Sequence, residues 1–176
     1  MRRRLKIATL LATIATVLAA CAATSPVAAA APCPHQSNLA APAAAQERAM
    51  LCLVNRARTS RGLSPLASPS LLNQAADRKS GDMLRCDEFS HEACGREFTY
   101  WIERFGYEAC GAGENIAWGS GSRGTALSIF RAWMHSSGHR RNILGPYADI
   151  GIGLRVGSIE GFSGARVWTQ QFGTRC

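Results

Sequence analysis

The sequence contains no C-x-x-C pair, no internal repeat and no apolar run long enough to cross a bilayer comfortably. The missing C-x-x-C pair argues against a structural zinc site built from cysteines. The mainly apolar run Ile7–Ala20 has 14 residues, which is short for a membrane-spanning helix and suits the hydrophobic region of a signal peptide. About 146 residues remain if the first 30 are removed on export, which is enough for one domain with its own core.

The first 30 residues have the order of a signal peptide, because Arg2–Arg4 and Lys6 precede the apolar run. Two ways of processing are open. Small residues at 27–30 suit ordinary signal peptidase, which predicts a mature chain that begins between Ala29 and Pro32. Alternatively, Leu18–Cys21 resembles a lipobox, which would make Cys21 a lipid anchor and the protein a membrane-anchored lipoprotein. We favour soluble secretion.

The charge of the chain is less basic than it first looks. It has 20 Lys and Arg against 12 Asp and Glu, and four of the cations lie in the signal segment, so 16 − 12 leaves +4 on the exported part. The remaining arginines are scattered along the sequence and no base-stacking motif accompanies them, which argues against nucleic acid as a partner. A weak attraction to anionic cell-wall polymers is compatible with this charge.

Cysteine parity also fits export. Removing or lipidating Cys21 leaves six of the seven cysteines. An even number in an exported chain indicates three disulfides, for which 15 pairings are possible. The six are Cys33, Cys52, Cys86, Cys94, Cys110 and Cys176.

Apolar periodicity divides the exported part into an Ala/Pro-rich arm, residues 31–44, and a domain, residues 45–176. Apolar residues three and four apart predict four helices in the domain. They run from Gln46 to about Gly62, from Pro69 to about Arg85, from Phe98 to Gly106, and from Thr125 until Gly138 breaks the last one.

The end of the chain alternates between apolar and other residues, which predicts a β-hairpin with strands at 150–156 and 167–172 around a turn at 158–161. Residues 107–118 are expected to be irregular to extended. Helices followed by a hairpin indicate an α+β layered domain. Residues 161–165 nearly match the G-x-S-x-G nucleophile motif, but alanine ends them and they fall in the turn between strands, so nucleophilic catalysis has little support.

Five ordered motifs resemble the bacterial branch of the CAP superfamily, which comprises cysteine-rich secretory proteins, antigen 5 and pathogenesis-related 1 proteins. The resemblance covers residues 45–174 and implies a three-layer α-β-α sandwich, stapled by disulfides, with a cleft on one side. The motifs are Leu53–Arg58, Phe89–His91, Gly113–Trp118, Trp133–Leu144 and Asp149–Gly153.

The resemblance places His91, Glu114 and His139 in that cleft, with Trp118 at its border. Two imidazoles and a carboxylate with an open fourth position would make a zinc site of the catalytic type. Eukaryotic members typically carry a further glutamate where this chain has Ser136, and the neighbouring His135 is a candidate replacement. The competing interpretation is that the three residues only hydrogen-bond loops together.

Asn55 and Arg58 match an Asn-x-x-Arg motif of the family, for which we expect a structural role in which Arg58 bonds loop carbonyls. For the cysteines we predict three pairs. Cys33–Cys52 would tie the arm to the first helix, Cys86–Cys94 would close the loop that presents His91, and Cys110–Cys176 would join the Glu114 segment to the last strand.

The leading functional hypothesis is an exported, non-enzymatic CAP-domain protein. Its cleft would take a divalent metal, zinc being the candidate, or an apolar ligand similar to a lipid or sterol, as the superfamily implies. One alternative is a metal-dependent extracellular hydrolase that acts on peptide or wall polymer. The other is a structural, disulfide-stapled interaction module.

Overall fold

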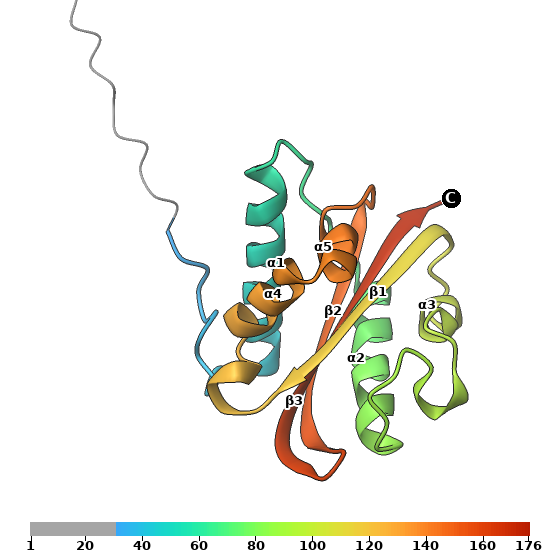
Figure 1. Cartoon of the computed structure of the whole chain (residues 1–176). Helices are drawn as coiled ribbons and strands as arrows, with labels where there is room; N and C mark the ends of the chain where they lie inside the picture. Colours follow the sequence, from blue (N-terminus) through green and yellow to red (C-terminus); the bar gives the residue numbers. More distant parts are fainter. Residues whose placement is uncertain (1–30) are drawn as a thin grey trace, which may run out of the picture. The chain divides into compact units, whose positions relative to one another are not determined.

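The computed structural model describes residues 31–176, so the predictions for the signal segment and for Cys21 lie outside the described residues. A three-stranded sheet separates two helical layers (Figure 1). This is the α-β-α sandwich expected from the sequence. The elements are α1 (Ala43–Thr59), α2 (Ser70–Arg85), α3 (Tyr100–Arg104), β1 (Ala109–Gly119), α4 (Ala126–His135), α5 (Ser137–Ile143), β2 (Asp149–Ile159) and β3 (Phe162–Arg175), with short 3-10 turns at Ala93–Gly95 and Gly121–Gly124.

The sheet is antiparallel with the strand order β1-β3-β2. The hairpin predicted from the alternating pattern is confirmed, and its strands are β2 and β3. The chain turns at Glu160 and Gly161, whose φ angles are 48° and 81°. The segment expected to be irregular to extended, residues 107–118, forms most of a full strand, β1, which pairs with β3 along its length. One side of β1 is therefore an edge of the sheet.

The helix α2 lies unusually close to the sheet. A Cβ atom on Gly151 would meet the backbone of Leu72, and one on Gly153 would meet the backbone of Ala76, so glycine is required at both positions of β2. Between the two layers, Ser80 Oγ and Thr169 Oγ1 form a buried hydrogen bond of 2.8 Å. The close approach fixes α2 as the platform on one face of the sheet.

The other face carries the largest core cluster, in which α1 and α4 pack on the inward side chains of β2 and β3. Arg58 of α1 is buried and donates hydrogen bonds to the carbonyls of Ser64, Ile143, Gly145 and Tyr147, at 2.8–3.3 Å. This confirms its expected structural role. Asn55 has a similar role. Its Oδ1 accepts from the Leu66 amide, and its Nδ2 donates to the Leu66 carbonyl.

Two helix boundaries differ from the sequence prediction. The fourth predicted helix is capped by Thr125, whose Oγ1 accepts from the Ser128 backbone, as expected. It ends at His135 rather than at Gly138, because Ser136 is extended (φ −89°, ψ 126°) and Gly138 lies inside the next helix, α5. The Ala/Pro arm also differs, since α1 begins at Ala43 and so includes its last residues.

Residues 31–176 form three disulfides, and they are the predicted pairs: Cys33–Cys52, Cys86–Cys94 and Cys110–Cys176. The first holds the arm against α1, where Cys33 is buried. A backbone hydrogen bond from Leu127 to the Gln36 carbonyl also ties the arm to α4. In the region from residue 31 onward, no helix has the length and apolar character needed to span a membrane.

Candidate functional site

The candidate site lies at the free edge of β1. Glu114, Ile116 and Trp118 alternate along this strand and project toward the face of the sheet that α2 covers, as their pairing with residues 171, 169 and 167 of β3 requires. Trp133 of α4 donates from Nε1 to the Ile116 carbonyl at 3.2 Å, so α4 approaches the same edge from the other side. The edge is thus flanked by the loop after α2 and by the α4–α5 junction.

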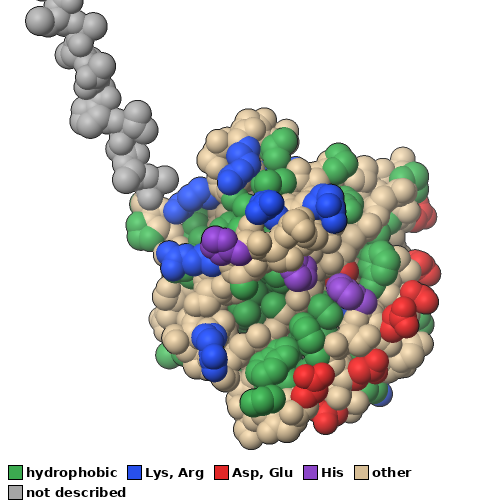
Figure 2. Space-filling view, in the orientation of Figure 1, with side chains coloured by type: hydrophobic (Ala, Val, Ile, Leu, Met, Phe, Trp, Pro, Cys, Tyr) green, Lys and Arg blue, Asp and Glu red, His purple; other side chains and the backbone are tan. Residues whose placement is uncertain are grey.

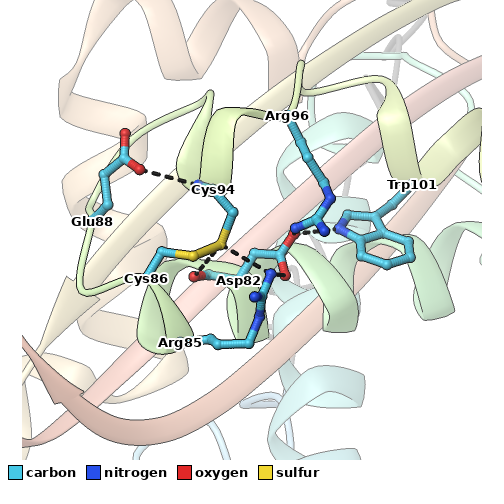
Figure 3. Close-up of a disulfide and its surroundings, with 7 residues drawn as sticks. All are labelled: Asp82, Arg85, Cys86, Glu88, Cys94, Arg96 and Trp101. Carbon is cyan, nitrogen blue, oxygen red and sulfur yellow. Dashed lines mark hydrogen bonds and ion pairs between the residues drawn. A yellow bond between two sulfur atoms is a disulfide. The ribbon is translucent and has the colours of Figure 1, made fainter.

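His91 lies in the loop that follows α2, and its side chain is 53% exposed. The Cys86–Cys94 disulfide closes this loop, and Glu88 accepts a hydrogen bond from the Cys94 backbone (Figure 3). Below the loop, the ammonium group of Lys79, a residue of α2 that is only 1% exposed, donates to the His91 carbonyl. The backbone of His91 is therefore held from two directions while its ring faces solvent.

Glu114 is the buried partner of His91. His91 Nδ1 donates to Glu114 Oε1 at 2.6 Å, and Gln171 Nε2 donates to Oε2 at 2.6 Å. The Glu114 side chain is 2% exposed. Burial raises the pKa of this carboxyl group, while the His91 hydrogen bond and the nearby Lys79 charge oppose the increase. Both carboxyl oxygens of Glu114 are thus engaged within the protein.

His139 lies on α5, with its ring tilted against Trp133 at 6.4 Å between ring centroids. Its Nδ1 atom is buried and has no hydrogen-bond partner within residues 31–176. Burial lowers the pKa of His139, and the neighbouring His91 lowers it further, so the ring is neutral at pH 7. The Asn115 side chain fixes its backbone by donating to the His139 carbonyl at 3.1 Å.

Three neighbouring hollows share residues and form one groove along the β1 edge. Their volumes are about 340, 300 and 550 Å³. Trp118 joins the first two, and Phe89, Ile116 and His139 join the second to the third. Figure 2 shows hydrophobic side chains running beside the histidines on this surface. The groove therefore passes from an apolar mouth to a polar end.

The walls of the groove are unequal in polarity. Its mouth is formed by Trp118 and Phe162, whose rings lie 5.0 Å apart and of which Phe162 is 56% exposed. The middle is apolar. The far end carries His91 and His139. The remaining residues that line the three hollows are Ser90, Glu92, Ala117, Gly119, Ser120, Arg123, Ala132, Trp133 and Ser136.

The residues do not fit the three-ligand metal site that the sequence suggested. Across residues 31–176, no three His, Cys, Asp or Glu side chains are grouped so that they could hold a metal ion. The physical reason is that the two oxygens of Glu114 are occupied by His91 and Gln171, while His139 contacts neither oxygen. His135, the candidate replacement ligand, is exposed at the end of α4 and lines none of the three hollows.

Sequence reasoning missed the polar residues that position the site. Asn142 donates to the Glu114 carbonyl at 3.0 Å and to the Asn115 side chain at 2.9 Å. Asn115 in turn donates to Gln170 at 3.0 Å. Asn115 and Asn142 lie in two of the five family motifs, Gly113–Trp118 and Trp133–Leu144, so these motifs could have identified both residues. Nothing in the spacing of Lys79 or Gln171 distinguishes either from an ordinary polar residue on a helix or strand.

Residues 51–172 match the family described as the cysteine-rich secretory protein family, CAP. This chain belongs to that family. An uncharacterised protein of Bacillus subtilis, YkwD, is 39% identical over 132 residues, which cover 73% of this chain. The same residues cover 47% of YkwD, so the chain spans about half the length of this relative.

Solved structures share the fold at low sequence identity. An outer surface protein of Borrelia burgdorferi has a TM-score of 0.62 at 16% identity, covering 72% of this chain and 90% of that one. An extracellular protein of Bacillus anthracis that contains an SCP domain has a TM-score of 0.61 at 22% identity, covering 77% and 44%. A cysteine-rich secretory protein of Staphylococcus aureus gives 0.54 at 19%, covering 74% and 38%.

Proposed function

We propose that this CAP-domain protein is exported and binds an elongated amphipathic ligand, of fatty-acid or sterol type, in the groove along β1 without altering it chemically. The observation that supports this most is the continuity of the groove from its aromatic mouth to its histidine end. Export is supported by three disulfides, which persist in oxidising compartments.

The apolar part of the ligand would lie against Phe89, Ile116 and Trp118. Small-molecule sites are typically concave and mostly apolar, with a few polar groups that fix orientation. The volumes of the three hollows fall in the range of such sites. A bound hydrocarbon would also cover Phe162, which is otherwise a large apolar side chain left in water.

The polar end of the ligand would lie between His91 and His139. The exposed ring of His91 has a second nitrogen that Glu114 does not occupy, because Glu114 takes Nδ1. Because His139 Nδ1 is buried, Nε2 is the nitrogen of the neutral ring that a ligand could reach, as a donor or an acceptor according to the tautomer. A hydroxyl or carboxyl head group matches this pair.

Two features favour binding over the hydrolase alternative. Glu114, which would be the general base, has both oxygens committed to protein donors and a side chain that is 2% exposed. Ser136 lines the apolar middle of the groove rather than its polar end. If the domain is only a structural module, the groove has no ligand, and dye binding by the wild type separates this alternative from the proposal.

The test is displacement of a neutral, polarity-sensitive dye, Nile red, by palmitate and by cholesterol. We expect the dye to bind the wild type and to be displaced by one or both lipids. Trp118→Ala should weaken dye and lipid binding about tenfold, because it removes an aromatic contact worth roughly 1.5 kcal/mol.

Tyr100→Ala is the matched control, because Tyr100 is an aromatic residue that is 39% exposed and lies on α3, outside the groove. It should bind like the wild type. No dye binding by the wild type would favour the structural module. Equal binding by wild type and Trp118→Ala would place the ligand elsewhere and refute the proposal.

A further inference from the structure

A second surface of the molecule is defined by charge. No acidic residue occurs between Glu114 and Asp149, whereas this stretch contains Arg123, Arg131, Arg140 and Arg141. It includes α4, α5 and the turn before them. We call these four arginines and the helices that carry them the α4–α5 face. Its formal charge of +4 is as large as that of the whole exported part of the chain.

The arginines of the α4–α5 face are exposed and lack acidic partners. For Arg123, Arg131 and Arg141, no side-chain hydrogen bond or ion pair occurs within residues 31–176, and all four side chains are solvent-exposed. Arg140 donates only to the Met134 carbonyl, at 3.0 Å, which holds it against the end of α4. Such unpaired, exposed cations are available to an external anion.

Arginines on the α2 side behave differently. Arg85 and Arg96 both bind the buried Asp82, each at 2.9 Å, and Trp101 donates to the same carboxylate (Figure 3). Arg155 binds Asp77 through two nitrogens. These three cations are neutralised within the protein, whereas Arg78 and Arg104 on the same side are exposed and form no ion pair within residues 31–176.

Acidic residues gather on the opposite flank of the groove. Residues 82–114 contain eight Asp and Glu against three Arg, so this stretch has a formal charge of −5. Figure 2 shows Lys and Arg side chains over one part of the visible face and Asp and Glu over another, with histidines between them. The acidic and the basic stretch therefore lie on different parts of this surface, with histidines between them.

We propose that the α4–α5 face docks on a phosphate-bearing polymer outside the cell, a polyanion of the kind found in bacterial cell walls. Arginine suits phosphate because its planar guanidinium group donates two parallel hydrogen bonds. Several cations spread over two connected helices suit a polymer with repeated negative charges better than they suit one small anion. The acidic flank would repel the same polymer and so orient the molecule on it.

A membrane surface fits this face less well. Docking at a bilayer normally adds exposed apolar or aromatic anchors to the basic residues. In the described part of the chain, the large exposed hydrophobic residues are Leu39, Tyr100, Val156 and Phe162, and none of them lies between residues 115 and 148. Arg123 also lines the mouth of the groove, but Arg131, Arg140 and Arg141 line none of the three hollows, so the docking of this face can be tested apart from the ligand of the groove.

The experiment measures binding of the exported chain to long-chain inorganic polyphosphate at two salt concentrations. Four phosphate contacts on a flexible polyanion predict about 50-fold weaker binding at 200 mM than at 50 mM salt. Arg131→Glu combined with Arg141→Glu should weaken binding at least tenfold at low salt and flatten the salt dependence. Circular dichroism and melting curves establish that the variant is folded.

The matched control combines Arg78→Glu with Arg104→Glu, two exposed arginines outside the α4–α5 face. Both double variants reduce the net charge by the same four units, so the control separates the face from net charge. It should bind within about twofold of the wild type at 50 mM salt. Equal losses in the two variants, or no binding by the wild type, would overturn the proposal.

Two further experiments identify the source of the phosphate and separate this face from the groove. Vesicles of phosphatidylglycerol should bind more weakly than polyphosphate; the opposite order would make the partner a membrane and overturn the assignment. In the Arg131/Arg141 variant, displacement of Nile red by lipid should remain as in the wild type. Because the groove and the α4–α5 face have separate readouts, failure of one proposal is distinguishable from failure of the other.

Discussion

Replacing His91 by alanine tests how the polar end of the groove is held together. His91 is the only side chain that donates to Glu114 Oε1 in the described part of the chain, and the distance is 2.6 Å. In the variant His91→Ala this oxygen loses its donor, while Gln171 still donates to the other oxygen. The hydrogen-bond interpretation therefore predicts a loss of folding stability, even though the mutated ring is half exposed.

The magnitude follows from burial. Leaving a buried polar group without its partner costs roughly 1–3 kcal/mol. The Glu114 side chain is 2% exposed, which favours a sizeable cost, but removal of a half-exposed ring admits water to Oε1. We therefore expect a loss of about 1–2 kcal/mol. For a domain of this size that lowers Tm by about 2–8 °C.

The assay compares thermal melts and urea unfolding of the wild type, His91→Ala and His139→Ala, with and without zinc. His139→Ala should cost under about 1 kcal/mol, since it removes no hydrogen bond from Glu114. Zinc should leave all three Tm values unchanged. A wild-type Tm that rises with zinc, together with a His139→Ala Tm that does not, would refute the hydrogen-bond interpretation and show that zinc binds at His139.

The other predictions concern pH, the disulfides and processing. The folded-state pKa of His139 lies below its unfolded value near 6.5 because burial disfavours the charged ring, so its contribution to stability is complete above pH 6.5 and is lost as the pH falls toward the folded pKa. His139→Ala should therefore lose less stability than the wild type between pH 7.5 and 5, which urea midpoints would measure; parallel pH profiles would contradict this. Breaking the bond between Cys110 and Cys176 by double alanine substitution should cost about 2–4 kcal/mol, and an unchanged unfolding free energy would be the contrary result. Intact mass of the exported protein should show an N-terminus at residues 29–32, and a diacylglyceryl group on Cys21 would show the lipoprotein route instead.

Most of the fold is predictable because its periodicities are strong. The stripes of α1, α2 and α4 and the alternation of β2 and β3 repeat over two or more turns or several residue pairs. The sequence predicts only an irregular to extended segment where β1 lies, because Gly111 and Gly113 interrupt any alternation, and Glu114 and Asn115 place polar residues where a buried strand would have apolar ones. Partners supplied by β3, α5 and the loop that carries His91 satisfy those side chains, and such partners are invisible in a local pattern.

The site is predictable only in part, for a related reason. The family resemblance singled out His91, His139 and Trp118, and the structure brings all three to one groove. The family resemblance does not indicate that both carboxyl oxygens of Glu114 point into the protein. That orientation depends on Gln171, which is 57 residues away in the chain. The break at Ser136 rather than Gly138 has a similar origin, since glycine is tolerated within a short helix that packing and hydrogen bonds hold in place.

The most direct test of ligand binding in the groove is the response of the tryptophan indole N–H signals in a ¹⁵N NMR spectrum to palmitate and, separately, to cholesterol. Trp118 and Trp133 line the groove, whereas Trp168 is fully buried in the core and Trp101 donates to Asp82 on the α2 side. We predict that the Trp118 and Trp133 signals shift and saturate while the Trp101 and Trp168 signals stay in place. Trp118 and Trp133 signals that stay unchanged at saturating concentrations of both lipids, or a shift confined to Trp101, would contradict the groove as the binding site.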